Sequence, residues 1–197
     1  MVNALRKIMR NTLRLLGIRD AYLKHIVYNR FGMALLGRIN YFRWKEIDII
    51  LIMWPPASPL FNEINEYISK YHDIKSFEIV QICDDKFEKF IYELYKIDFA
   101  NPRKVALKID VLLNSPVYDL GVLKIRISKP NMEVQDILNR VRCESVGDLK
   151  DRIRKKYKDR ILNYTYDVII HSTEVNYQNN KVLKVLKKYA CSSVTTK

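Results

Sequence analysis

The sequence predicts an α+β domain, with an antiparallel sheet and helices, that follows a basic helical N-terminal extension. From residue 47 onward, short apolar runs of strand length alternate with amphipathic stretches of helical period. The composition is that of a globular protein, with 48% hydrophobic and 29% charged residues. The net charge of +13 is uneven, because residues 1–46 carry ten Lys or Arg and two acids, whereas the remainder carries 25 and 20.

This division predicts a basic helical extension over residues 1–46 and a more balanced domain over residues 47–197. Within the extension, Asn3 is suited to be an N-cap and Gly17 a C-terminal stop for an amphipathic helix. Basic side chains occupy the face opposite its apolar residues. Two interpretations stay open: a helix that packs on its own core, or one that contacts an anionic membrane surface or nucleic acid.

Four strands are predicted in the domain, each beside turn-forming or helical sequence. They are expected at 47–53, 77–82, 117–127 and 166–170, the third being either one strand or a hairpin broken at Gly121. Helices are expected at 58–68, 84–95, 102–112, 134–141 and 177–189, whereas 145–157 is polar and strongly basic. Pro55 and Pro56 end the first strand, and Ser58 is expected to cap the first helix.

This order of elements is compatible with a ferredoxin-like fold of the βαββαβ type. In such a fold, helices cover one face of an antiparallel sheet of about four strands. Because helical sequence separates the second strand from the third, a doubly wound α/β sheet is the alternative. Periodicity alone does not distinguish the two.

The positions of glycine and cysteine disfavour several kinds of site. None of the five glycines lies in a GxxxxGK[ST] or GxGxxG motif, so neither a P-loop nor a dinucleotide-binding turn is expected. The three cysteines are widely spaced and form no CxxC pair, which predicts no zinc site, no disulfide framework and a reducing compartment. No apolar run reaches the roughly 18 residues that span a bilayer, and the N-terminus lacks a signal-peptide pattern. We therefore expect a cytoplasmic protein, or one peripheral to a membrane.

His171 is the candidate for a catalytic residue. It ends a predicted buried strand in YDVIIHSTE, and functional side chains are commonly presented where strands end. The residues that precede it are rich in Lys and Arg: Arg140, Arg142, Lys150, Arg152, Arg154, Lys155, Lys156 and Lys158. The alternative interpretation is a histidine that hydrogen-bonds the backbone at a strand end.

The segment Val168–Glu174, VIIHSTE, resembles the active-site segment N-I-I-H-G-S-D of nucleoside diphosphate kinases. Two further similarities follow the family's order. Ile153 and Arg154 match its I-R pair upstream of the histidine, and Ser115–Val117 stands in the place of its G-P-V. The order of elements from 47 to 190 is also similar, so the resemblance covers about three quarters of the chain.

Three positions depart from the family pattern. Trp54 stands where the family has a phosphate-binding lysine, Val168 where it has asparagine, and Ser172 where it has the glycine after the histidine. Loss of the lysine removes one fixed positive charge from the phosphate site.

The resemblance implies a nucleotide-binding phosphotransferase in which His171 accepts a phosphoryl group from a nucleoside triphosphate. It also implies that Arg142 and Arg154 neutralise the phosphate oxygens and that Thr173 or Glu174 hydrogen-bonds the second ring nitrogen or the acceptor hydroxyl. Mg²⁺ would accompany ATP or GTP, with no metal site of the protein's own, and an oligomer is compatible with this interpretation. The alternative function is a non-catalytic basic protein that binds nucleic acid or an anionic membrane surface.

Overall fold

The computed structural model describes residues 46–98, 100–135, 140–162 and 164–194. The chain divides into two compact units, Met1–Arg43 with Met132–Arg142, and Trp44–Asn131 with Cys143–Lys197. Strands β4 (Met132–Gln135) and β5 (Arg140–Cys143) pair in a separate two-stranded sheet. The helix predicted within residues 1–46 lies outside the described residues.

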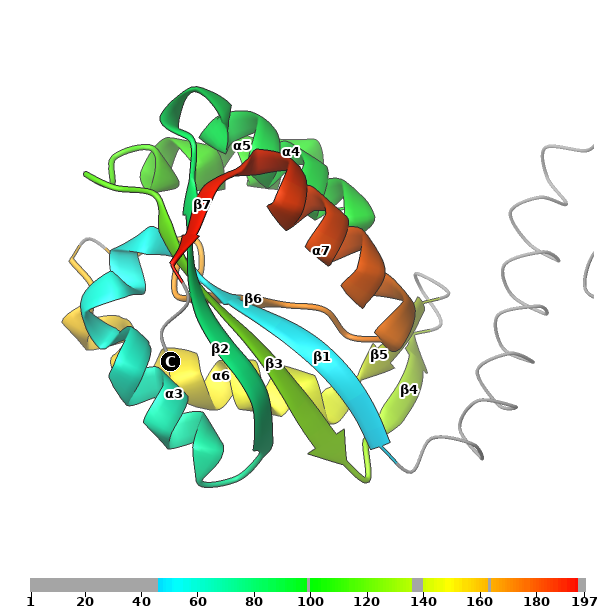
Figure 1. The fold of residues 1–197 in the computed structure, drawn as a ribbon. Helices are drawn as coiled ribbons and strands as arrows, with labels where there is room; N and C mark the ends of the chain where they lie inside the picture. Colours follow the sequence, from blue (N-terminus) through cyan, green and yellow to red (C-terminus); the bar gives the residue numbers. More distant parts are fainter. Residues whose placement is uncertain (1–45, 99, 136–139, 163, 195–197) are drawn as a thin grey trace, which may run out of the picture. The chain divides into compact units, whose positions relative to one another are not determined.

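A five-stranded sheet forms the centre of the second unit (Figure 1). Its strands are β1 (Glu46–Met53), β2 (Asp73–Ile82), β3 (Asp119–Ser128), β6 (Ile170–Ser172) and β7 (Ala190–Val194). They lie in the order β6-β1-β3-β2-β7, and every neighbouring pair is antiparallel. The prediction of an antiparallel sheet is therefore confirmed, and the doubly wound parallel alternative is wrong.

Helices lie on both sides of this sheet. Figure 1 shows α3 (Phe61–Ser69) and α6 (Glu144–Tyr157) on one side, and α4 (Phe87–Ile97), α5 (Pro102–Leu112) and α7 (Asn176–Tyr189) on the other. Short 3-10 helices occupy Pro55–Leu60, Asp84–Lys86 and Lys158–Arg160. The expectation of helices on one face was wrong, because Ile49–Met53 is buried at every position and a strand of this kind needs cover on both faces.

Several predicted boundaries were wrong for local reasons. The helix expected at 134–141 is replaced at its two ends by β4 and β5. A segment of eight residues is too short for its hydrophobic period to distinguish a helix from a strand. The fourth strand begins at Ile170 instead of residue 166, since Tyr166 and Asp167 have φ values of 50° and 55°, which interrupt extended backbone.

Gly121 does not break the third strand into a hairpin, because β3 is continuous from Asp119 to Ser128. Gly121 instead pairs with Met53, and the side chains of Met53 and Phe61 occupy the place that a Cβ atom would take. A Cβ atom at this position would collide with Met53 Cε and lie 3.2 Å from Phe61 Cγ. The glycine is therefore explained by close packing between β1, β3 and α3.

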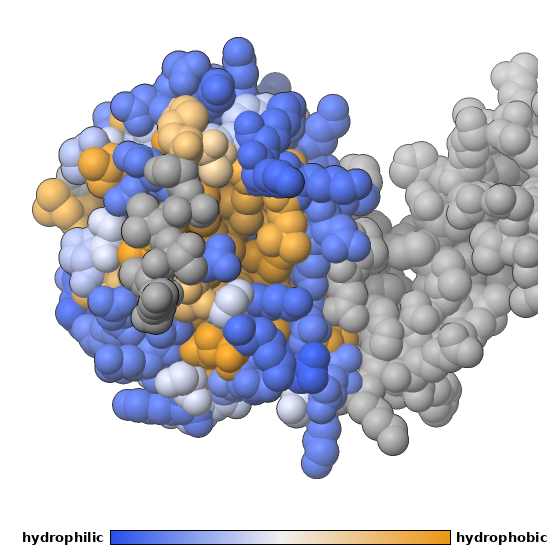
Figure 2. All heavy atoms as spheres, viewed as in Figure 1, coloured by the Kyte–Doolittle hydropathy of each residue, from blue (hydrophilic) through white to orange (hydrophobic). Residues whose placement is uncertain are grey.

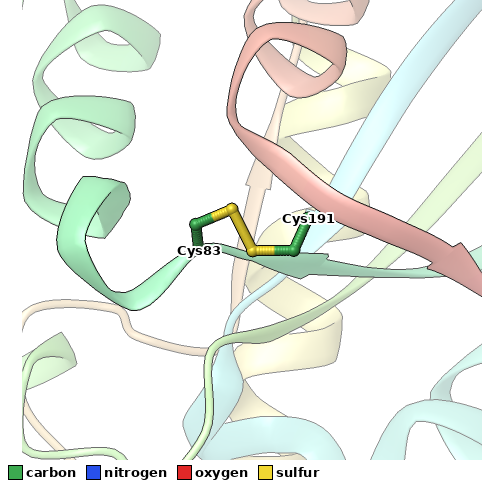
Figure 3. The surroundings of a disulfide bond; sticks show 2 residues. All are labelled: Cys83 and Cys191. Atoms are coloured by element: carbon green, nitrogen blue, oxygen red, sulfur yellow. A yellow bond between two sulfur atoms is a disulfide. The ribbon is translucent and has the colours of Figure 1, made fainter.

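A disulfide joins Cys83 to Cys191 (Figure 3), which contradicts the expectation that the cysteines form no such bond. Cys83 follows β2 directly and Cys191 lies in β7, and the two strands pair in the sheet. A separation of 108 residues concealed this pair in the sequence. Because disulfides persist mainly in oxidising compartments, the predicted cytoplasmic location stays a prediction.

The surface on the face viewed in Figure 2 is mostly hydrophilic, with apolar side chains gathered near its middle. Among the helices within the described residues, none is both long and apolar enough to cross a membrane.

Candidate functional site

His171 is the middle residue of β6 and pairs with Ile52 of β1. Its side chain is 10% exposed, and its Nε2 atom lies 3.3 Å from Asp98 Oδ2 just after α4. The imidazole also contacts two aromatic rings, with centroid distances of 6.2 Å to Trp54 and 4.9 Å to Tyr95. The histidine is therefore held between the end of β1 and the end of α4.

Burial lowers the pKa of His171 well below its usual range, and the positive charges of Lys108, Lys150 and Arg154 lower it further. The imidazole is therefore neutral at neutral pH. Because Nε2 faces a carboxylate, the favoured tautomer carries its proton on Nε2 and keeps the lone pair on Nδ1. We name His171, Asp98, Lys108, Lys150 and Arg154 the His171 cluster.

Lys108 is a buried cation that the sequence analysis missed. It is 8% exposed, and its Nζ atom donates a hydrogen bond to the carbonyl oxygen of Asp167 at 3.0 Å. The Nζ atom also lies 5.8 Å from the centroid of the Trp54 ring and 5.3 Å from that of Tyr95. Burial, followed by the charge of Arg154, lowers the pKa of Lys108 to about 7.

A signal for Lys108 was present in the sequence. The buried face of α5 is formed by Val105, Lys108, Ile109 and Leu112, which follow the spacing of an apolar helix face. A lysine at a core position of an amphipathic helix is unusual, because lysine is almost never fully buried. The periodicity therefore singles out Lys108 once the helix boundaries are known.

The other two cations of the cluster come from α6, and each already faces a carboxylate. Lys150 Nζ lies 3.2 Å from Glu174 Oε1. Arg154 lies 3.3 Å from Asp151 through Nη1 and 3.6 Å from Asp167 through Nε. The structure thus brings the predicted residue Arg154 into the electrostatic environment of His171.

The remaining predicted site residues have other contacts. Thr173 is 1% exposed, and its hydroxyl accepts a hydrogen bond from the Ile50 N–H at 2.8 Å and donates one to Asn179 at 2.6 Å. Glu174 faces Lys150, so the residue that contacts the second ring nitrogen of His171 is Asp98. Arg142 belongs to the other compact unit. The nucleotide-binding roles of these three predicted residues stay predictions.

Two aromatic side chains beside the cluster have a buried polar atom without a hydrogen-bond partner among the described residues, Trp54 Nε1 and Tyr95 Oη, and so does Arg154 at its Nε atom. Burial, together with the charge of Asp98, raises the pKa of Tyr95, so the phenol keeps its proton and remains a donor. Within the described part of the chain, no group of three or more His, Cys, Asp or Glu side chains could hold a metal ion.

Comparison with known proteins gives similarity at the level of structure only. The sequence matches no protein-family model and no curated protein. A crystal structure of the nucleoside diphosphate kinase of Aquifex aeolicus is similar to this chain with a TM-score of 0.41 and 13% identity. The similarity covers 72% of this chain and 94% of that chain. At these values it does not establish a family, so any function must be argued from the residues of the His171 cluster.

Proposed function

We propose that the protein is a nucleotide-binding phosphotransferase in which His171 accepts a phosphoryl group from a nucleoside triphosphate. One observation carries the proposal: a neutral imidazole has a carboxylate at one ring nitrogen and lies in the field of three basic side chains. A neutral ring is nucleophilic, and cations offset the charge of the phosphate that it attacks. We further propose a ferredoxin-like fold, because β6-β1-β3-β2 has the split βαβ arrangement of such domains.

In this mechanism, Nδ1 of His171 attacks the γ-phosphorus in line with the bond to the β,γ-bridging oxygen. The N–P bond forms, the P–O bond breaks, and the nucleoside diphosphate leaves with the electron pair. The Asp98 carboxylate would accept a hydrogen bond from the Nε2–H group and stabilise the positive charge that develops on the ring. The oxygen of an acceptor hydroxyl would then attack the phosphorus, the N–P bond would break and return its electron pair to Nδ1, and the hydroxyl proton would pass to solvent.

The cations of the His171 cluster would lie against the equatorial phosphate oxygens. The phosphate would approach past Asp98 and Arg154, whose side chains are partly exposed. Mg²⁺ would enter with the nucleotide, bound to its phosphates, since the described residues offer no cluster of ligands for it. The choice of ATP or GTP and an oligomeric state remain predictions, as does a cytoplasmic or membrane-peripheral location.

Phosphoryl transfer to His171 predicts a labelled protein. After incubation with γ-labelled ATP or GTP and Mg²⁺, the wild-type protein should carry label that is stable in base and labile in acid. His171→Ala should carry none, and Asp98→Asn should be labelled more slowly by about tenfold or more, because the imidazole loses the carboxylate that orients it. His72→Ala is the matched control, since His72 lies just after the C-terminal end of α3, outside the His171 cluster, and should not affect labelling. Absence of label on the wild type, or equal label on His171→Ala, contradicts the proposal.

The second candidate function, binding of nucleic acid, is favoured by one surface. On the outer side of α6, the Lys156 Nζ atom lies 4.3 Å from the Tyr67 ring centroid and the Arg152 guanidinium carbon 5.6 Å from that of Tyr71, which is 57% exposed. A cleft of about 560 Å³ adjoins them, lined by His72, Ser145, Asp148, Asp151, Arg152 and Lys155. An exposed aromatic ring and a half-buried one, both beside cations, are typical of surfaces that bind single strands.

Binding through this surface predicts a strong dependence on salt. The double substitution Arg152→Ala with Lys156→Ala should weaken binding of a single-stranded oligonucleotide and reduce the slope of log K against log[salt] by about 1.4. Lys184→Ala with Lys187→Ala on α7, both exposed, is the matched control. Fluorescence anisotropy measures both quantities, and anionic liposomes test the membrane alternative. Unchanged affinity and slope in the α6 variant exclude this surface as the contact.

A further inference from the structure

We propose that Lys108 is the anion-binding cation of the His171 cluster, and that its ammonium group contacts the terminal phosphate of the bound substrate. This inference deepens the proposed function and rests on it. The ammonium group of Lys108 lies next to Trp54, which follows β1, although Lys108 itself belongs to helix α5.

Two of the three cations in the His171 cluster already face carboxylates. Lys150 faces Glu174, and Arg154 faces Asp151 and Asp167. Among the described residues, no carboxylate forms an ion pair with Lys108: the Asp167 carboxylate acts on it only from a distance, and the hydrogen bond of its Nζ atom goes to the backbone carbonyl of Asp167. A buried cation without an anion is costly to a fold, so its occurrence calls for an explanation. An anionic ligand supplies the missing partner.

The charges around Lys108 determine where an anion would bind. Lys108 is surrounded by Arg154 and Lys150 on α6, Asp167 before β6, His171 on β6 and Tyr95 on α4, and Asp98 in turn lies beside His171 and Tyr95. The field of Lys108 acts on the imidazole of His171 more strongly than that of any other charge. An anion beside Lys108 would therefore also lie beside the proposed nucleophile.

Two aromatic side chains beside Lys108 carry hydrogen-bond donors. Trp54 and Tyr95 flank the Lys108 ammonium group with their rings, and the Nε1 and Oη atoms of these residues are buried donors without a partner among the described residues. Phosphate oxygens accept bonds from donors of these kinds. The lysine thus lies where aromatic side chains exclude water and unpaired donors remain available, which suits an anion that must be desolvated.

The protonation state of the Lys108 amine in the free protein provides an experimental test. Burial leaves Lys108 largely deprotonated at pH 8, whereas a bound phosphate would favour its protonated form. Binding should therefore take up a proton, which a purely structural lysine would not do. Calorimetric titration with tripolyphosphate, in two buffers of different ionisation enthalpy, measures affinity and proton uptake together.

Wild-type protein should bind tripolyphosphate at pH 8 with an uptake of about 0.5 to 1 proton more than Lys108→Met shows. Lys108→Met should bind at least tenfold more weakly, and Lys108→Arg should bind without the additional uptake because arginine stays charged. Lys104→Met, an exposed lysine on the same helix, is the matched control and should behave as wild type. Equal affinity of the wild type and Lys108→Met, equal proton uptake, or no binding by the wild type would each overturn the inference.

The labelling experiment separates this inference from the proposed function. Labelled His171 together with unchanged anion binding by Lys108→Met would leave phosphoryl transfer standing and remove Lys108 from the site. Binding that depends on Lys108 without any labelled histidine would support the anion site and contradict the transfer.

Discussion

Replacement of Lys108 by methionine should raise the free energy of unfolding at pH 7 by about 1–3 kcal/mol. The pKa of Lys108 falls from its usual 10.5 to about 7 in the folded protein, which corresponds to a cost of roughly 5 kcal/mol for keeping the amine buried. Methionine fills a similar volume without charge, but it leaves the Asp167 carbonyl without its donor, so only part of this cost is recovered. The melting temperature should rise by about 3–10 °C.

The stabilisation that Lys108→Met brings should depend on pH. Between pH 7 and pH 10.5, the unfolded chain holds the Lys108 proton and the folded protein does not, so stability from this group increases as pH rises. Most of the advantage of Lys108→Met should therefore have disappeared at pH 9.5. Denaturant titrations at both pH values measure the difference, with Lys104→Met as the exposed control. A Lys108→Met variant less stable than wild type at pH 7 would mean that the amine stabilises the fold.

Reduction of the Cys83–Cys191 disulfide should lower the free energy of unfolding by about 2–5 kcal/mol. The bond closes a loop with a sequence separation of 108 residues, and cross-links that close long loops restrict the unfolded chain most. It also fixes β7, which is an edge strand paired only with β2 in the described sheet. The melting temperature should fall by about 5–15 °C when a reductant is added.

The control for this experiment is the double variant Cys83→Ser with Cys191→Ser. Its melting temperature should equal that of the reduced wild-type protein and should not respond to reductant. Peptide mapping without reductant establishes the pairing before the comparison. A wild-type protein that holds the bond and yet melts at the same temperature with and without reductant would show that the cross-link contributes little.

The elements predicted well from the sequence were those with a long, regular period. The apolar run of β1 and the amphipathic faces of α4, α5 and α7 lie close to their predicted bounds. The strands β4 and β5 were missed because pairing between strands, and not the local period, decides their conformation. The strand β7 was missed because nothing in its short sequence indicates that β2 has a free edge.

The candidate site was predicted only in part, for a related reason. His171 stood out because it directly follows an apolar run, and the basic character of α6 led to Arg154. Asp98 and Lys108 come from elements that are distant in sequence, and no local motif connects either of them with the histidine. Their contribution depends on how α4 and α5 pack against the sheet, which only the three-dimensional structure gives.

Thr173 contributes to the register of β6, which sets the side of the sheet that carries the imidazole. Side chains alternate between the two faces of a strand, so a slip of β6 by one residue along β1 would turn His171 away from α4 and α5. A strand of only three residues has little pairing of its own to prevent such a slip. The backbone N–H of Thr173 donates to the Ile50 carbonyl, and the Thr173 hydroxyl accepts from the Ile50 N–H, which together fix the register. A side chain that does not contact the imidazole thus helps to keep the imidazole facing Asp98.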